Sequence, residues 1–195
     1  MSAGFKYDLN APAVVEEHYD VQTGHRKRGP YKLDVTGIAV GTVLPSLAPV
    51  SVNLKTRVCT PVVNVKVIEA VASDATAIKV AKGSLVKVGM FLGTGSKGAK
   101  VSAIDNSNAN YDTVTVEAAF GAAIKAGAVL FQSPAVGGTT PKNTANFLIY
   151  EHKKVEEGIN LVALLMQAYE IQEEKLTLPI SEKDKATLTC RFQFE

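Results

Sequence analysis

The chain has 195 residues, is 46% apolar and 21% charged, and carries a formal net charge of +2. These values predict a soluble globular protein with a substantial core, exclude a disordered chain, and give no reason to expect a nucleic-acid partner. We see no secretion signal and no apolar run near the roughly 20 residues that a membrane-spanning helix needs, so we expect no membrane partner. Cys59 and Cys190 have neither disulfide-scaffold nor metal-cluster spacing, which is typical of synthesis in a reducing cytoplasm.

Residues 1–34 are predicted to form an extended N-terminal arm. Prolines and glycines interrupt the segment, and its apolar residues follow no sustained period. Such a segment forms no core of its own, so we expect it to lie on a larger body. Phe5, Tyr7 and Leu9 alternate with polar residues, as they would in a strand added to the edge of a partner's sheet.

Residues 35–135 are full of β signals. Stretches 62–69, 77–80 and 113–117 largely alternate apolar and polar residues and are rich in β-branched side chains. Runs of Gly, Ser, Asn and Asp separate them at spacings that are typical of a sandwich or small barrel. We therefore predict a β-rich domain over residues 35–195.

Residues 93–98, GTGSKG, match the G-x-G-x-x-G pattern of dinucleotide-binding sites. That fingerprint requires a helix after its third glycine, because the pyrophosphate rests on the helix N-terminus. Only seven residues separate Gly98 from the breaker run 106–110, and a crossover between parallel strands needs at least about 10 to 12. The glycines are therefore interpreted as turn residues, and no cofactor is expected.

The other features typical of enzymes are weak. His18, His25 and His152 are scattered without metal-ligand spacing, and no nucleophile motif is present. Tyr111 and Asp112 lie beside an asparagine-rich loop, where a loop-anchoring role is favoured over ligand binding. We expect no catalytic residue and no metal site, and hence a protein that is not an enzyme.

The C-terminal third leaves helix and strand open. Residues 160–175 are rich in helix formers, yet their apolar residues run nearly unbroken, as in a strand buried on both faces. Ser181 begins a capping sequence that predicts a short helix at 181–188. Residues 189–194 alternate as a final strand, with Cys190, Phe192 and Phe194 expected on one face.

Several stretches together resemble proteins of tailed bacteriophages. Residues 41–44 (GTVL) followed by 48–50 (APV), with an echo at 125–130 (KAGAVL), are similar to the entry segment of head-decoration proteins. The order and spacing of 146–150, 155–158, 162–169, 174–176 and the final helix and strand resemble them too. With residues 4–7 and 28–31, the chain resembles the head fibre or auxiliary capsid proteins of crAss-like and related phages.

This resemblance implies a mainly β fold of the phage head-decoration type, with one short C-terminal helix. It favours a strand over residues 160–171. It also implies a homotrimer that binds the major capsid protein on the outer surface of the virion, after synthesis in the host cytoplasm. The alternative hypothesis is a cell-surface or glycan-binding module, although the absence of Trp argues against it.

We predict that Phe5, Tyr7, Leu9, Arg26, Lys27 and Arg28 contact the capsid. For the basic run at residues 25–28, a solvated loop, a contact with nucleic acid or a targeting receptor, and docking to an acidic capsid surface stay open.

Overall fold

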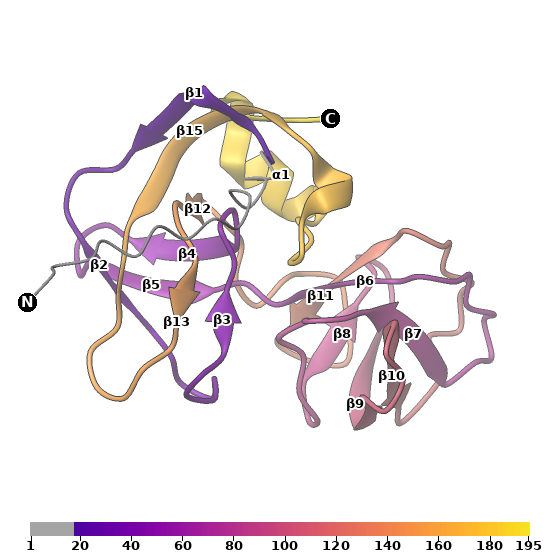
Figure 1. Ribbon diagram of the computed structural model, residues 1–195. Helices are drawn as coiled ribbons and strands as arrows, with labels where there is room; N and C mark the ends of the chain where they lie inside the picture. Colours follow the sequence, from indigo (N-terminus) through magenta and orange to yellow (C-terminus); the bar gives the residue numbers. More distant parts are fainter. Residues whose placement is uncertain (1–17) are drawn as a thin grey trace, which may run out of the picture.

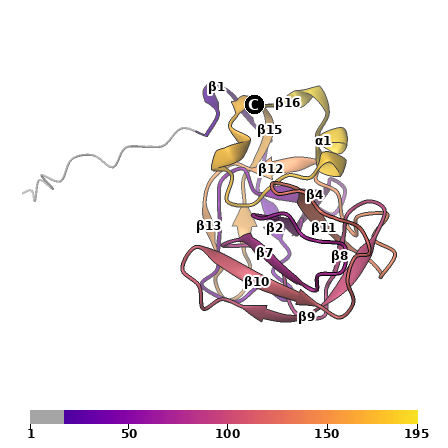
Figure 2. The same cartoon turned by 90° about the vertical axis from the view of Figure 1, so that its right-hand side faces the viewer.

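The structure is a computed structural model, and it describes residues 18–195. Within this part, most strands belong to two curled sheets that lie side by side, with the single α-helix packed over one of them (Figure 1). Figure 2, turned by 90°, places the second sheet in front of the first. The prediction of a mainly β fold with one short C-terminal helix is confirmed.

The first sheet curls into a structure that we call the first barrel. Its order is β1-β15-β12-β4-β5-β2-β14, and β16 pairs with β15 off this path. Closure follows from β14, which pairs with β2 and leads almost directly into β15 on the other side of the sheet. The strands are β1 (Asp20–Arg26), β2 (Tyr31–Leu33), β4 (Pro49–Asn53), β5 (Val58–Pro61), β12 (Phe147–Ile149), β14 (Leu161–Val162), β15 (Leu164–Ile171) and β16 (Phe192–Phe194).

Alternation along these strands sends one set of apolar residues to the inside. Val52 lies opposite Cys59, and Leu33 lies beside Cys59 in the parallel β2–β5 pair, so all three share a face. These residues are almost completely buried. Burial of the whole interior stabilises the barrel by roughly 25 cal/mol per Å² of apolar surface. The interior contains Tyr31, Leu33, Leu44, Val50, Val52, Cys59, Phe147, Ile149, Val162 and Leu164.

The second sheet forms the second barrel. Its order is β6-β11-β8-β9-β10-β7, and an antiparallel bridge between Val67 and Val80 joins its two ends. Its strands are β6 (Asn64–Lys66), β7 (Ala77–Ala81), β8 (Phe91–Gly93), β9 (Gly98–Asp105), β10 (Tyr111–Val116) and β11 (Val129–Ser133). A separate core of mostly Val, Leu and Ile fills it. Because an edge strand exposes unpaired backbone groups, the closure protects this sheet from unwanted pairing.

The second barrel is an insertion into the first. The chain leaves the first barrel after β5, forms all six strands of the second, and returns before β12. A two-stranded sheet of β3 (Val43–Leu44) and β13 (Lys153–Lys154) flanks the first barrel.

The C-terminal segment covers part of the outer face of the first barrel. Helix α1 (Glu182–Leu188) begins at Ser181 with a capping box, as the sequence predicts. The short 3-10 turns η1 (Glu173–Lys175) and η2 (Thr189–Arg191) flank it. Leu188 and Phe192 pack with Leu148 and Leu165 of the barrel in a third apolar cluster. None of the helices in residues 18–195 is long and apolar enough to cross a bilayer.

The structure decides the ambiguous segment in favour of strands. Residues 161–171 form β14 and β15, because Leu164, Leu165, Ala168 and Ile171 are all buried between the barrel interior and the α1 layer. The prediction for Cys190 is wrong. Cys190 lies in η2 and is exposed, and the final strand starts only at Phe192. A 3-10 turn with Thr189 at a φ of 62° breaks the alternation expected there.

The described part of the expected N-terminal arm is paired with the sheet. Strand β1 pairs with β15, and β2 pairs with β5 and β14. Tyr31 and Leu33 of β2 contribute to the interior of the first barrel. Phe5, Tyr7 and Leu9 lie outside the described residues, so their predicted role stays a prediction.

Candidate interaction surfaces

Basic side chains cover aromatic rings at one edge of the first barrel. The Arg26 guanidinium lies 5.1 Å from the ring centroid of Tyr150. Lys27 and Arg191 both approach the ring of Phe147, at 6.0 and 5.1 Å. Cation–π contacts of this kind each contribute roughly 0.5–1 kcal/mol at exposed sites. They orient the side chains but leave their charge available to a partner.

Of the predicted capsid-contacting residues, the structure thus places Arg26 and Lys27 at this aromatic edge. Arg28 follows in an exposed turn. Within residues 18–195, none of these three cations forms an ion pair.

A buried carboxylate joins helix α1 to both barrels. Asp184 is completely buried. Its Oδ2 accepts hydrogen bonds from Asn64 Nδ2 (2.8 Å), Ser181 N (3.1 Å) and Ser181 Oγ (2.5 Å), and its Oδ1 accepts one from Ala145 N (2.8 Å). Asn64 begins the second barrel, and Ala145 ends the segment that returns to the first. The four donors compensate the cost of burying the carboxylate, which identifies Asp184 as a structural residue.

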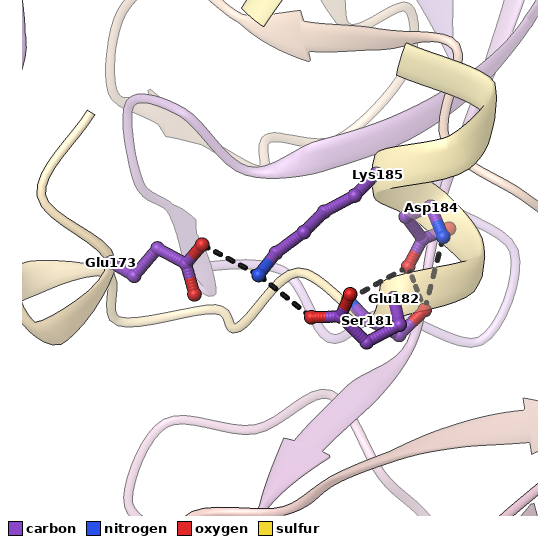
Figure 3. A network of polar contacts seen from close by, with 5 residues as sticks. All are labelled: Glu173, Ser181, Glu182, Asp184 and Lys185. Carbon is purple, nitrogen blue, oxygen red and sulfur yellow. Dashed lines mark hydrogen bonds and ion pairs between the residues drawn. The ribbon is translucent and has the colours of Figure 1, made fainter. Parts of the chain in front are cut away.

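The next residue of the helix, Lys185, takes part in a separate set of ion pairs, as Figure 3 shows. Lys185 Nζ lies 2.6 Å from Glu173 Oε1 and 2.8 Å from Glu182 Oε1. Burial alone lowers the pKa of Lys185, but its hydrogen bonds to the two carboxylates outweigh burial and raise the pKa above its usual range. The ion pairs connect η1 to α1 and supply no reactive group.

The titratable residues from 18 to 195 lie at separate places in the fold. No group of three or more His, Cys, Asp or Glu in residues 18–195 is arranged to hold a metal ion. His152 Nδ1 accepts a hydrogen bond from Ser46 N (3.3 Å), while Asp112 forms an ion pair with Lys82 (2.6 Å). Burial raises the pKa of the Cys59 thiol to about 12, so this thiol is not a nucleophile at neutral pH.

The G-x-G-x-x-G segment forms a β-hairpin, and of its glycines interpreted as turn residues, Gly95 lies in the turn. Gly93 ends β8 and pairs with Gly98 at the start of β9, in an antiparallel ladder with no helix after it. Gly95 has a φ of 96°, which favours glycine. The sequence did not indicate the role of the two outer glycines. A Cβ on Gly93 or Gly98 would lie within 2.8 Å of the Gly138 backbone. The two glycines therefore leave the space that the loop around Gly138 needs to pack against the hairpin.

Two adjoining cavities lie against the first barrel. One, of about 400 Å³, lies where the barrels meet, and the other, of about 860 Å³, lies over β4 and β5. Thr60 lines both, so the two adjoin there, and we call them together the Thr60 furrow. Sequence reasoning missed it because its walls come from segments that are far apart in the chain.

Comparison with known proteins identifies one family. A family model described as head fiber protein matches residues 1–193. No curated protein and no solved structure gives a significant match. The resemblance noted in the sequence is therefore confirmed at the level of the family, while the crAss-like subtype stays a prediction.

Proposed function

The chain belongs to the phage head fiber protein family, and on that premise we propose that it attaches to the outer surface of the phage capsid. It is a phage structural protein and a virion component. In the proposed function it carries out no catalysis, is made in the host cytoplasm, and either stabilises the head or anchors a fibre there. The observation that carries the proposal is the family match over nearly the whole chain.

The surface chemistry supports a binding role. Arg26 and Lys27 are oriented by aromatic rings and form no ion pair within residues 18–195, so they are available to an acidic partner. The major capsid protein is the proposed partner. Residues 5–9 of the chain, with their alternating apolar and polar side chains, are proposed to add a strand to a sheet edge of that protein.

Deletion of residues 2–17 tests this anchor. The deletion ends before Tyr19, which packs in the third apolar cluster, and before Asp20, which is paired with Tyr169. The expected result is a folded protein that no longer co-sediments with empty capsids of the phage that encodes it. Normal decoration by the shortened chain would show that the anchor lies elsewhere.

The same assay distinguishes capsid binding from the alternative hypothesis of a glycan-binding module. The full chain is expected to bind empty capsids and not host cell-surface polysaccharide. Binding to the polysaccharide with no binding to capsids would refute the capsid proposal.

We also propose that the chain assembles as a homotrimer. The apolar residues from 161 to 166 are mostly inside the fold, with Val162, Leu164 and Leu165 buried, so they do not by themselves require a partner. Exposed apolar groups remain at Leu161, the first residue of strand β14, and at Ile159 just before it, which are 50% and 74% exposed. Light scattering is expected to return three times the 20.7 kDa chain mass at micromolar concentration, and a monomer would contradict the proposal.

A further inference from the structure

The Thr60 furrow runs along a part of the outer face of the first barrel that no other segment of residues 18–195 covers. Asn53 lies opposite Val58, Val58 beside Lys32, and Lys32 opposite Leu161, so these four residues form one row across β4, β5, β2 and β14. The neighbouring row points into the barrel, hence this one points outward. Asn53, Lys32 and Leu161 are exposed, in contrast to the part of the outer face that α1 covers.

Three lysines and one carboxylate line the furrow. Lys55 lies at one end, and Lys87 and Lys142 line the end between the barrels. All three are exposed, and none forms an ion pair with any residue from 18 to 195. Asp34 is the one acidic residue in the lining. Its Oδ1 already accepts a hydrogen bond from Thr36 N (3.0 Å), so its charge is partly engaged.

Several lysines outside the furrow have acidic partners. On the second barrel, Lys79 pairs with Glu69, Lys82 with Asp112, and Lys100 with Glu117, at 2.6 to 3.0 Å. The furrow lysines have none within residues 18–195, and Lys32, in the same outward row as Asn53 and Val58 of the furrow, adds a further positive charge. The furrow therefore carries an excess of positive charge, which attracts an acidic partner.

Shape and composition favour a polypeptide as that partner. The two cavities adjoin at Thr60, and the half-buried side chains of Ile38, Leu85 and Met90 provide an apolar surface at one end for the aliphatic parts of a partner's side chains. None of the lining residues, all within the described part of the chain, is aromatic. Sugar-binding grooves commonly use aromatic platforms, so a saccharide fits this lining less well than a peptide.

We propose that the Thr60 furrow binds an extended acidic segment of the capsid protein. The proposal rests on the proposed function for its choice of partner. It adds a second contact, independent of residues 1–17. The furrow presents side chains and not a strand edge, so it recognises charge and leaves main-chain pairing to other surfaces.

The first test uses the isolated protein and a fluorescent peptide that alternates Glu with Gly and Ser. Fluorescence anisotropy measures its affinity for the wild type and for the Lys87→Glu/Lys142→Glu variant. Since a hydrogen bond to a charged group contributes on the order of one factor of ten in affinity, the variant is expected to bind at least about tenfold more weakly. Binding by the wild type is expected to weaken as salt is added.

The matched control is Lys125→Glu/Lys154→Glu, which makes the same change in net charge at two exposed lysines outside the furrow. Its affinity is expected to fall less than about twofold, because exposed charges beyond a Debye length are screened. Equal losses in the two variants would overturn the proposal, because they would indicate general electrostatic attraction. Polygalacturonate that binds the furrow while the peptide does not would also overturn it, in favour of a saccharide.

A second test uses capsids. The proposal is supported if the wild-type chain decorates capsids and the Lys87→Glu/Lys142→Glu variant, which we call the furrow variant, decorates them poorly. Equal decoration by both refutes the furrow and leaves the proposed function intact. Wild-type chain that fails to decorate capsids refutes the proposed function, and with it the capsid protein as the occupant of the furrow. Circular dichroism confirms that both variants fold before either assay.

Discussion

Substitution of Asp184 should destabilise the whole protein more than any change to the exposed charges beside it. The carboxylate accepts four hydrogen bonds while fully buried, and its donors belong to α1, to the second barrel and to the segment returning to the first. Asp184→Asn preserves shape and removes the charge. Its amide oxygen can still face the three donors around Oδ2, but its NH2 group then opposes the Ala145 N–H.

The magnitude follows from these contacts. A buried N–H that loses its acceptor costs about 1–3 kcal/mol. Three charge-assisted bonds become neutral ones, at about 0.5–1 kcal/mol each, since the charged form is roughly twice as strong. Relief from burying a charge offsets part of this, and we expect a net loss of about 3 kcal/mol in the free energy of unfolding. That is a large share of the roughly 5–15 kcal/mol typical of a folded domain.

Urea denaturation followed by circular dichroism measures this loss, and hydrogen exchange locates it. The Ala145 amide proton should exchange much faster in Asp184→Asn, because its acceptor is gone. Glu182→Gln is the control, since Glu182 lies on the same helix with its side chain 86% exposed. It should change stability by less than about 0.5 kcal/mol. A loss below about 1 kcal/mol for Asp184→Asn, or unchanged exchange at Ala145, would refute the assignment of Asp184 as the joint between the barrels.

Two further predictions concern buried positions. In the native protein only Cys190 should react with a thiol reagent at pH 8, because Cys59 is buried. Burial raises the pKa of Cys59 from 9.0 to about 12, so the unfolded chain loses this proton at a lower pH than the native protein does. The free energy of unfolding should therefore fall as the pH rises above 9, by about 1.4 kcal/mol per pH unit. Cys59→Ala should lack that pH dependence, and equal reactivity of both thiols would contradict the burial. Gly138→Ala should lower the free energy of unfolding by about 3 kcal/mol or more, because its φ is +63° and a Cβ would lie 2.1 Å from Lys97 O. Gly95→Ala meets no neighbour and should lower it by about 1 kcal/mol. Denaturant titration measures both losses. Similar losses in the two glycine variants would refute the close approach.

The sequence predicted those features that depend on local alternation and capping. The alternation at 77–80 and 113–117 appears as β7 and β10, and Ser181 caps α1 as its spacing indicates. The echo of residues 41–44 at 125–130 also has a structural counterpart. Gly41 and Gly127 each have a positive φ and lie two residues before a strand, β3 and β11 respectively. The Gly41 N–H donates to Val155 O, and the Gly127 N–H donates to Val67 O. Local chemistry of this kind is readable because it needs no distant partner.

Features that depend on contacts between residues far apart in the chain could not be predicted from the sequence. The insertion of one barrel into another is invisible in a run of similar short strands, because alternation does not say which strand a given strand pairs with. Asp184 is an ordinary polar residue of a helix until Asn64 and Ala145 are brought to it. Residues 161–171 read equally as helix or strand, since the burial of both faces that selects a strand comes from α1 on one side and the barrel interior on the other.

The same reasoning explains why composition gave no indication of an acidic partner. With 21 basic and 19 acidic residues the chain is nearly neutral, and nearly neutral chains have no overall field to attract a polyanion. The charge is arranged locally and is not visible in these totals. Lys55, Lys87 and Lys142 come from separate segments and line the Thr60 furrow, where Asp34 is the one carboxylate in the lining. None of these three lysines forms an ion pair within residues 18–195. Under the proposed function, the face of the molecule that carries the furrow lies against the capsid.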